Sequence, residues 1–235
     1  MTAPSKTPSL PPIPPLQPGD RLTRDEFERR YDAMPELRKA ELIEGVVYMP
    51  SPVRVEQHGD PHADLITWMG TYRANTPGVR ASVDASVRLD LDNEPQPDAL
   101  MYIQAAFGGQ THIDAEGYLV GGPELAAEVA ASNVSVARNN KLRVYRRNNV
   151  REYLIWRVED QAIDWYVLRQ GQYEQLQRTS AGLLQSEHFP GLWLDPDALR
   201  RFDVARVLQV LQQGIANPEH AAFVARLQQR AAGQP

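Results

Sequence analysis

The sequence predicts a mixed α/β fold, in which a central sheet is flanked by helices and followed by a helical tail. Three observations support this. Residues 125–131 are small or apolar apart from Glu128, as in a strand covered on both faces. Several other short segments alternate apolar and polar residues, and segments with helical spacing lie between them. With 235 residues, 42% of them hydrophobic, the chain can form one domain with appendages.

The N-terminal half begins with an arm that contains seven prolines within 19 residues. Because proline fixes φ and lacks a backbone donor, residues 1–19 are expected to be extended and poorly ordered. Thr23 and Glu26 have capping-box spacing, and the hairpin that follows should turn at Glu44-Gly45. The expected elements are a helix over about 23–34, a hairpin over 41–49, a helix over about 61–74, a strand region over 79–91, a strand over 98–103 and a loop over about 104–123.

The C-terminal half is expected to complete the sheet and add the tail. Its expected elements are a strand over 125–131, a helix over 135–148, strands over 151–158, 161–168 and 172–177, and helices over 195–213 and 218–230. We therefore divide the chain into an arm (1–19), a core domain (20–195) and a C-terminal helical extension (196–235).

Composition excludes several classes of protein. The chain has no cysteine, so cysteine-based zinc clusters, disulfide scaffolds and thiol nucleophiles are excluded, and a reducing cytoplasm is the expected location. The N-terminus lacks the pattern of a secretory signal, and no apolar run is long enough to span a bilayer. A net charge of −5 argues against a uniformly basic surface for indiscriminate nucleic-acid binding.

Acidic residues at strand positions are the first candidates for chemistry. Asp98 begins a predicted strand, Glu128 lies within the apolar one, and Glu41 begins the hairpin. A buried carboxylate needs a partner, and two interpretations of Glu128 are open. It forms an ion pair with a core arginine, or it joins Asp98 and a backbone carbonyl in holding a hard cation such as Mg²⁺ or Mn²⁺.

A basic segment follows the apolar strand. It carries six basic residues and no acidic one: Arg138, Lys141, Arg143, Arg146, Arg147 and Arg151. The segment is either an ordinary solvated helix face or a surface that receives phosphates. Lys141 is one of three lysines in the chain, and on an exposed helix face its replacement should change folding little.

Two histidines have the i, i+4 spacing of a metal pair. Pro61, between His58 and His62, disfavours a continuous helix, and no glutamate follows His58 as a zinc protease pattern requires. Zinc is therefore not the preferred cation. The sequence also lacks a serine nucleophile elbow, a phosphate-binding Walker loop and a dinucleotide fingerprint.

In order along the chain, the motifs resemble the Uma family of restriction-endonuclease domains, within the PD-(D/E)xK nuclease superfamily. The matching segments are Glu41-Leu42-Ile43-Glu44-Gly45, Ser51-Pro52 with His58 and Leu65, Gln96-Pro97-Asp98, Glu128-Val129, Lys141-Leu142 with Tyr145, Val150-Arg151-Glu152-Tyr153 and His188-Phe189-Pro190-Gly191-Leu192.

This resemblance implies a restriction-endonuclease-like core that hydrolyses DNA with Mg²⁺ or Mn²⁺. It assigns Asp98, Glu128 and the Val129 carbonyl to the metal, and Lys141 and Glu41 to catalysis. The catalytic lysine is displaced along the chain: Ala130 occupies the position of the lysine in the superfamily pattern, and Lys141 takes its role. Arg138, Arg143, Arg146 and Arg147 would hold DNA phosphates, and a homodimer is expected. The sequence departs from the family's pattern at Ala130–Asn133 and at Ala137. These departures keep a second hypothesis open, in which the protein is a catalytically silent module that binds nucleic acid or a protein.

Overall fold

The protein is built around a six-stranded mixed sheet. The computed structural model describes residues 12–49, 54–130 and 136–233, with side chains described from residue 139 onward in the last segment. The strand order is β11-β10-β9-β8-β5-β3, with β8 and β9 parallel and the other neighbours antiparallel. The strands are β3 (Val79–Val83), β5 (Ala99–Ile103), β8 (Leu125–Ala130), β9 (Glu152–Arg157), β10 (Ala162–Arg169) and β11 (Gln172–Gln175). The predicted mixed α/β class is confirmed.

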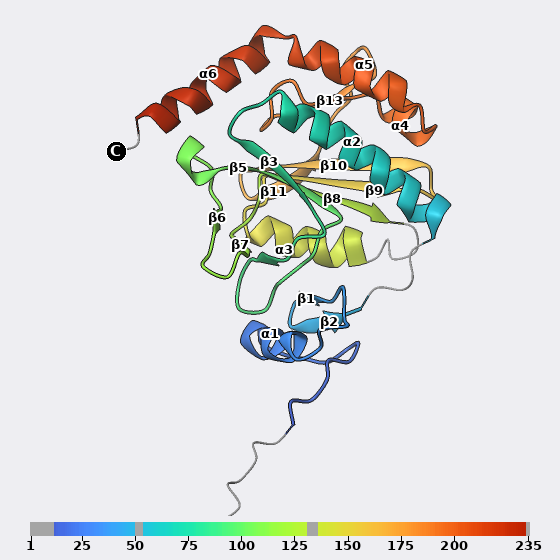
Figure 1. Ribbon diagram of the computed structural model, residues 1–235. Coiled ribbons are helices and arrows are strands. Elements are labelled where there is room, and N and C mark those ends of the chain that lie inside the picture. The colour runs from blue at the N-terminus through green and yellow to red at the C-terminus, as the bar shows by residue number, and fades with distance from the viewer. Residues whose placement is uncertain (1–11, 50–53, 131–135, 234–235) are drawn as a thin grey trace, which may run out of the picture.

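Helices cover both faces of this sheet, as Figure 1 shows. On one face α2 (Asp60–Ala74) and the C-terminal helices share the main hydrophobic core with the sheet, through residues such as Trp68, Leu154 and Val207. On the other face α3 (Leu142–Arg147) packs Tyr145 against Tyr153 of β9. The C-terminal helices are α4 (Pro196–Arg200), α5 (Val204–Ile215) and α6 (Pro218–Ala232).

Strand β8 lies inside the sheet, and all six of its residues are buried. Leu125, Ala127 and Val129 face the main core, whereas Ala126 and Ala130 belong to the cluster under α3. Alternation along a strand therefore points the Glu128 side chain to the α3 face. The predicted central strand is confirmed.

Two predicted elements are wrong because the backbone turns sharply within them. The expected strand region 79–91 divides at Asp84, whose φ is +47°, and β4 (Val87–Arg88) joins a separate small sheet with β6 (His112–Ile113) and β7 (Leu119–Val120). The expected terminal helix 195–213 divides into α4 and α5 at Phe202, whose φ is +59°. Asp203 then caps α5 by accepting a hydrogen bond from the Arg206 amide.

Short elements complete the chain. The expected loop 104–123 contains η2 (Ala105–Phe107), β6 and β7, and the helix expected over 135–148 is η3 (Val136–Lys141) followed by α3. Segment η1 (Val55–Gly59) leads into α2, and β12 (Leu184–Gln185) pairs with β13 (Trp193–Leu194).

The N-terminal unit packs below the α3 face (Figure 1). It consists of α1 (Arg24–Asp32) and the hairpin of β1 (Glu41–Ile43) and β2 (Val46–Tyr48). The hairpin turns at Glu44-Gly45 as predicted, with positive φ at both residues, a conformation that tight hairpin turns require. Thr23 precedes α1, but its side chain makes no capping hydrogen bond, contrary to the capping-box spacing.

Candidate active site

Sheet register brings together two acidic residues that are 30 positions apart in sequence. In the antiparallel pair of β5 and β8, Ala99 lies opposite Ala127, so one further step along the register places Asp98 opposite Glu128. The Val129 amide donates a 2.8 Å hydrogen bond to Asp98 Oδ2. Asp98 is therefore fixed against the strand that carries Glu128.

Lys141 joins Glu128 to the hairpin. Its Nζ lies 2.7 Å from Glu41 Oε1 and 2.7 Å from Glu128 Oε1, and the residue is only 4% exposed. The Gln96 amide donates to Glu41 Oε1 at 2.7 Å, and the Tyr145 hydroxyl donates to Glu128 Oε1 at 3.3 Å. The structure thus gives Glu128 a lysine as its ionic partner, instead of a core arginine.

A second lysine, which the sequence analysis did not select, lies on the other side of the site. Lys39 Nζ lies 3.0 Å from Asp98 Oδ1 and 2.9 Å from Asp84 Oδ1. Asp84 is the residue with positive φ at which the predicted strand breaks. The scarcity of lysine in the chain was the one sequence signal that could have identified Lys39.

The two histidines also belong to this site. Segment η1 runs directly into α2, so the helical path continues through Pro61, and the expected break there is wrong. His58 Nδ1 lies 3.1 Å from the Val129 carbonyl, and its Nε2 lies 3.7 Å from Asp98 Oδ1. His62 Nε2 lies 2.7 Å from the Asp98 backbone carbonyl. Both rings therefore contact the backbone of the acidic strands.

Burial and charge shift the pKa values in opposite directions within the site. Burial alone would raise the pKa of Asp98, but the positive charges of Lys39, His58 and Lys141 and the hydrogen bond from the Val129 amide together hold that pKa below its ordinary value. Burial raises the pKa of Glu128; Lys141 opposes this shift, whereas the negative charges of Asp98 and Glu41 add to it. For Lys141, burial would lower the pKa, but the nearby carboxylates raise it, so the ammonium form is retained.

The four arginines assigned to phosphate binding differ in their surroundings. Arg143 Nη2 lies 2.8 Å from Glu44 Oε2, and Arg147 bonds the same carboxylate as well as Asp90. Arg146 donates to the Gln172 side chain at 2.8 Å. The Arg138 side chain lies outside the described residues, as do the expected departure at 131–133 and the side chain of Ala137.

Oxygen atoms suited to a hard divalent cation converge here: the carboxylates of Asp98, Glu128 and Glu41, and the Val129 carbonyl. Within residues 12–49, 54–130 and 136–233, however, no group of three or more acidic or histidine side chains is assembled at metal-binding distance. The ammonium groups of Lys39 and Lys141 supply the positive charge around these carboxylates. The donor types fit a hard cation, and the two lysines compete for them.

The fold of this chain is similar to that of a solved structure. The chain is similar to a putative nuclease belonging to DUF820 from Anabaena variabilis ATCC 29413, with a TM-score of 0.52 and 17% identity, covering 76% of this chain and 99% of that chain. The fold is thus shared with a nuclease-like protein. The chain also matches the Uma2 family, described as "putative restriction endonuclease", over residues 24–197, and therefore belongs to that family. The resemblance found in the sequence is confirmed.

No curated protein matches the sequence. Among the described helices, none is both long and apolar enough to cross a bilayer.

Proposed function

We propose that this protein is a Mg²⁺- or Mn²⁺-dependent endonuclease that hydrolyses phosphodiester bonds of DNA. One observation carries the proposal: Lys141 lies 2.7 Å from both Glu41 and Glu128, and the sheet register places Asp98 opposite Glu128. Membership of the Uma2 family supports the same activity. Acidic ligands beside a lysine are the groups that metal-assisted phosphoryl transfer needs.

The proposed roles follow from position. Asp98, Glu128 and the Val129 carbonyl would hold the divalent cation, which when bound polarises a phosphoryl oxygen and acidifies a water molecule. Lys141 offsets the negative charge that develops on the phosphate, or orients the attacking water. Glu41 holds Lys141 in place while the Gln96 amide fixes Glu41.

The arginines of α3 would bind the flanking phosphates. Arg143 and Arg147 are exposed and share Glu44, so a phosphate would have to replace that carboxylate as their partner. Such contacts fix the position of the DNA without reading its sequence.

A plasmid-nicking assay tests the proposal. Supercoiled plasmid is incubated with the purified protein and Mg²⁺ or Mn²⁺, beside the isosteric variant Asp98→Asn. As a matched control, Asp197→Asn removes a carboxylate on α4 that pairs with Arg178 and Arg200. We expect nicking by the wild type and the control and none by Asp98→Asn. Equal nicking by all three proteins, or nicking by none of them, would refute the proposed nuclease activity.

The second candidate function is a catalytically silent module that binds nucleic acid or a protein. It is favoured by one observation, the occupation of the site's carboxylates by Lys39 and Lys141. Calorimetric titration with Mn²⁺ distinguishes the two functions. Binding that disappears in Glu128→Ala supports the enzyme, whereas absence of binding in the wild type supports the silent module.

A homodimer is the proposed assembly, with the strands from β9 onward supplying the interface. Sedimentation at micromolar concentration tests it. A mass near 26.4 kDa, that of one chain, would contradict the dimer.

A further inference from the structure

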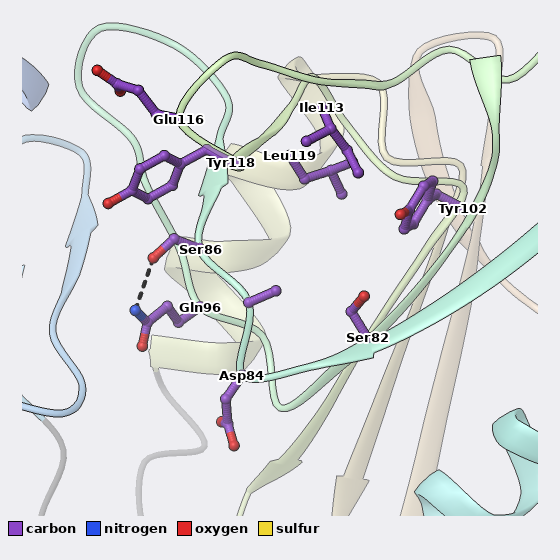
Figure 2. A pocket seen from close by; sticks show the side chains of 11 residues that line it. Ser82, Asp84, Ser86, Gln96, Tyr102, Ile113, Glu116, Tyr118 and Leu119 are labelled. Carbon is purple, nitrogen blue, oxygen red and sulfur yellow. Dashed lines mark hydrogen bonds between the residues drawn. The ribbon is translucent and has the colours of Figure 1, made fainter.

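A cavity of about 320 Å³, whose lining is drawn in Figure 2, includes Asp84, the partner of Lys39 in the acidic site. It opens between the edge strand β3, the turn that follows it, and the small sheet that contains β6 and β7. This volume lies in the range of small-molecule binding pockets, about 300–1,000 Å³. Side chains that define its chemistry include Ser82, Asp84, Gln96, Tyr102, Ile113 and Tyr118.

Two lining residues connect the cavity to the acidic site. Asp84 lines the cavity and bonds Lys39, which in turn bonds Asp98. Gln96 lines it as well, and its backbone amide donates to Glu41. The cavity is thus linked to Asp98 through the Asp84–Lys39 pair and to Glu41 through Gln96.

The lining does not suit a phosphate. Asp84 and Glu116 lie at the rim, and carboxylates outnumber their cationic partners there: Glu116 shares Arg88 with Glu28 and Asp114, and Asp84 shares Lys39 with Asp98. Like charges would repel an anionic ligand at this position. A neutral ligand that donates hydrogen bonds is favoured instead, since carboxylate and hydroxyl oxygens are acceptors.

The interior combines flat apolar surface with polar groups. Tyr102 and Tyr118 present aromatic rings, and Leu119 adds an apolar side chain (Figure 2). Ser86 is fixed by a 2.8 Å hydrogen bond from Gln96 Nε2. A ligand with a planar ring and donor groups on its edge matches this surface.

We infer that the cavity binds an unpaired nucleobase with an exocyclic amino group, such as cytosine or adenine, from a nucleotide next to the cleaved phosphate. This inference rests on the proposed nuclease function and adds a base preference to it. The ring of Tyr102 stacks on the base, whereas the Tyr118 ring already carries the Arg88 guanidinium, 4.0 Å from its centroid. The acceptors at the rim receive hydrogen bonds from the amino group of the base. Thymine lacks that amino donor and is bound more weakly.

Binding of defined oligonucleotides tests the inference without cleavage. The probes are fluorescein-labelled single strands of oligo-dT that carry one central dC, dA or abasic nucleotide, measured by anisotropy in EDTA. We expect the dC and dA probes to bind about tenfold more tightly than the abasic probe and plain oligo-dT. Equal affinity for all four probes would overturn the inference.

Variants of the lining assign the preference to the cavity. Ser82 lies on an edge strand, where phenylalanine is well tolerated, and Ser82→Phe fills the cavity whereas Ser82→Ala leaves it open. We expect Ser82→Phe to lose the tenfold preference and Ser82→Ala to keep it. A Ser82→Phe protein that is folded by circular dichroism and still prefers dC would contradict the cavity as the base site.

A matched pair of ring deletions completes the design. Tyr102→Leu removes a half-buried aromatic ring from the cavity, and Tyr166→Leu removes one from β10, outside it. A preference reduced in Tyr102→Leu and unchanged in Tyr166→Leu supports the inference, whereas equal behaviour of the two variants opposes it.

The outcomes also separate this inference from the proposed function. If the protein nicks plasmid in an Asp98-dependent way but binds all probes alike, the base pocket fails and the nuclease stands. If the dC and dA probes are preferred and no nicking occurs with any metal, the base pocket stands and the nuclease fails.

Discussion

Two lysines serve the same acidic site in different environments. Lys141 is 4% exposed and bonds two buried carboxylates, Glu41 and Glu128. Lys39 retains 23% of its side-chain exposure and bonds buried Asp98 and the exposed Asp84. A buried ion pair lacks solvent to replace a lost partner, whereas a partly exposed one is screened by water. Lys141 should therefore be a fixed part of the fold, and Lys39 an exchangeable partner of Asp98.

Replacing Lys141 should have the largest effect. Lys141→Met leaves two buried carboxylates without their cation, and we expect the free energy of unfolding to fall by about 3–5 kcal/mol. This corrects the sequence-based expectation of an exposed helix position. Urea denaturation measures the effect, and a loss below about 1 kcal/mol would contradict it.

The same position tests the chemistry. Lys141→Arg retains the positive charge but cannot place a compact ammonium between Glu41 and Glu128, so plasmid nicking should be lost as completely as in Lys141→Ala. Full nicking by a folded Lys141→Arg protein would remove Lys141 from the mechanism.

Glu94 shows how a buried carboxylate behaves without a lysine. It is 1% exposed, and neither of its oxygens has a hydrogen-bond donor among the described residues. Burial and the neighbouring Glu28 raise its pKa from 4.5 to about 8, against the smaller opposing effects of Arg88 and Arg24. The folded state thus favours protonated Glu94. Its stabilising contribution is complete below pH 4.5 and is lost as the pH rises through 8.

The corresponding variant is Glu94→Gln, which is neutral at every pH. We expect it to be about 1–3 kcal/mol more stable than the wild type at pH 9 and to lose this advantage near pH 4.5. Thermal or urea unfolding across that range provides the measurement. If the two proteins differ in free energy of unfolding by the same amount at pH 4.5 and at pH 9, the prediction is contradicted.

Lys39→Met should change stability by less than about 1 kcal/mol, because the pair reaches solvent. Its effect should instead appear in metal binding: removal of a competing ammonium from Asp98 Oδ1 should tighten Mn²⁺ binding by about two- to fivefold. Arg178→Met, which breaks an exposed pair with Asp197, is the control. Weaker Mn²⁺ binding in Lys39→Met would show that Lys39 supports the site.

The smallest effect is expected at the exposed arginines. Arg143→Ala should leave folding nearly unchanged, weaken DNA binding modestly and reduce the slope of log affinity against log salt by about one unit. Anisotropy titrations at several salt concentrations measure this slope. An unchanged slope would mean that Arg143 remains paired with Glu44 when DNA is bound.

The sheet was largely predictable from local pattern. Strands β8, β9 and β11 lie within their predicted ranges and β10 extends one residue beyond its range, to Arg169, because burial on one or both faces leaves a regular apolar pattern in the sequence. Two predicted elements break at Asp84 and Phe202, where non-glycine residues adopt positive φ. Local pattern cannot reveal such turns, because tertiary contacts stabilise a conformation that these residues disfavour on their own.

The sequence by itself determined the acidic residues and the lysine of the candidate site, because an isolated charge in an apolar segment and a rare lysine are visible without a structure. Only the tertiary structure decided how they are joined: Asp98 meets Glu128 through strand register, and Lys141 is buried against the hairpin. It also added Lys39, both histidines and the cavity, whose residues come from segments far apart in the chain. Contacts of this kind depend on how the strands pair and pack, which residue spacing along one chain does not encode.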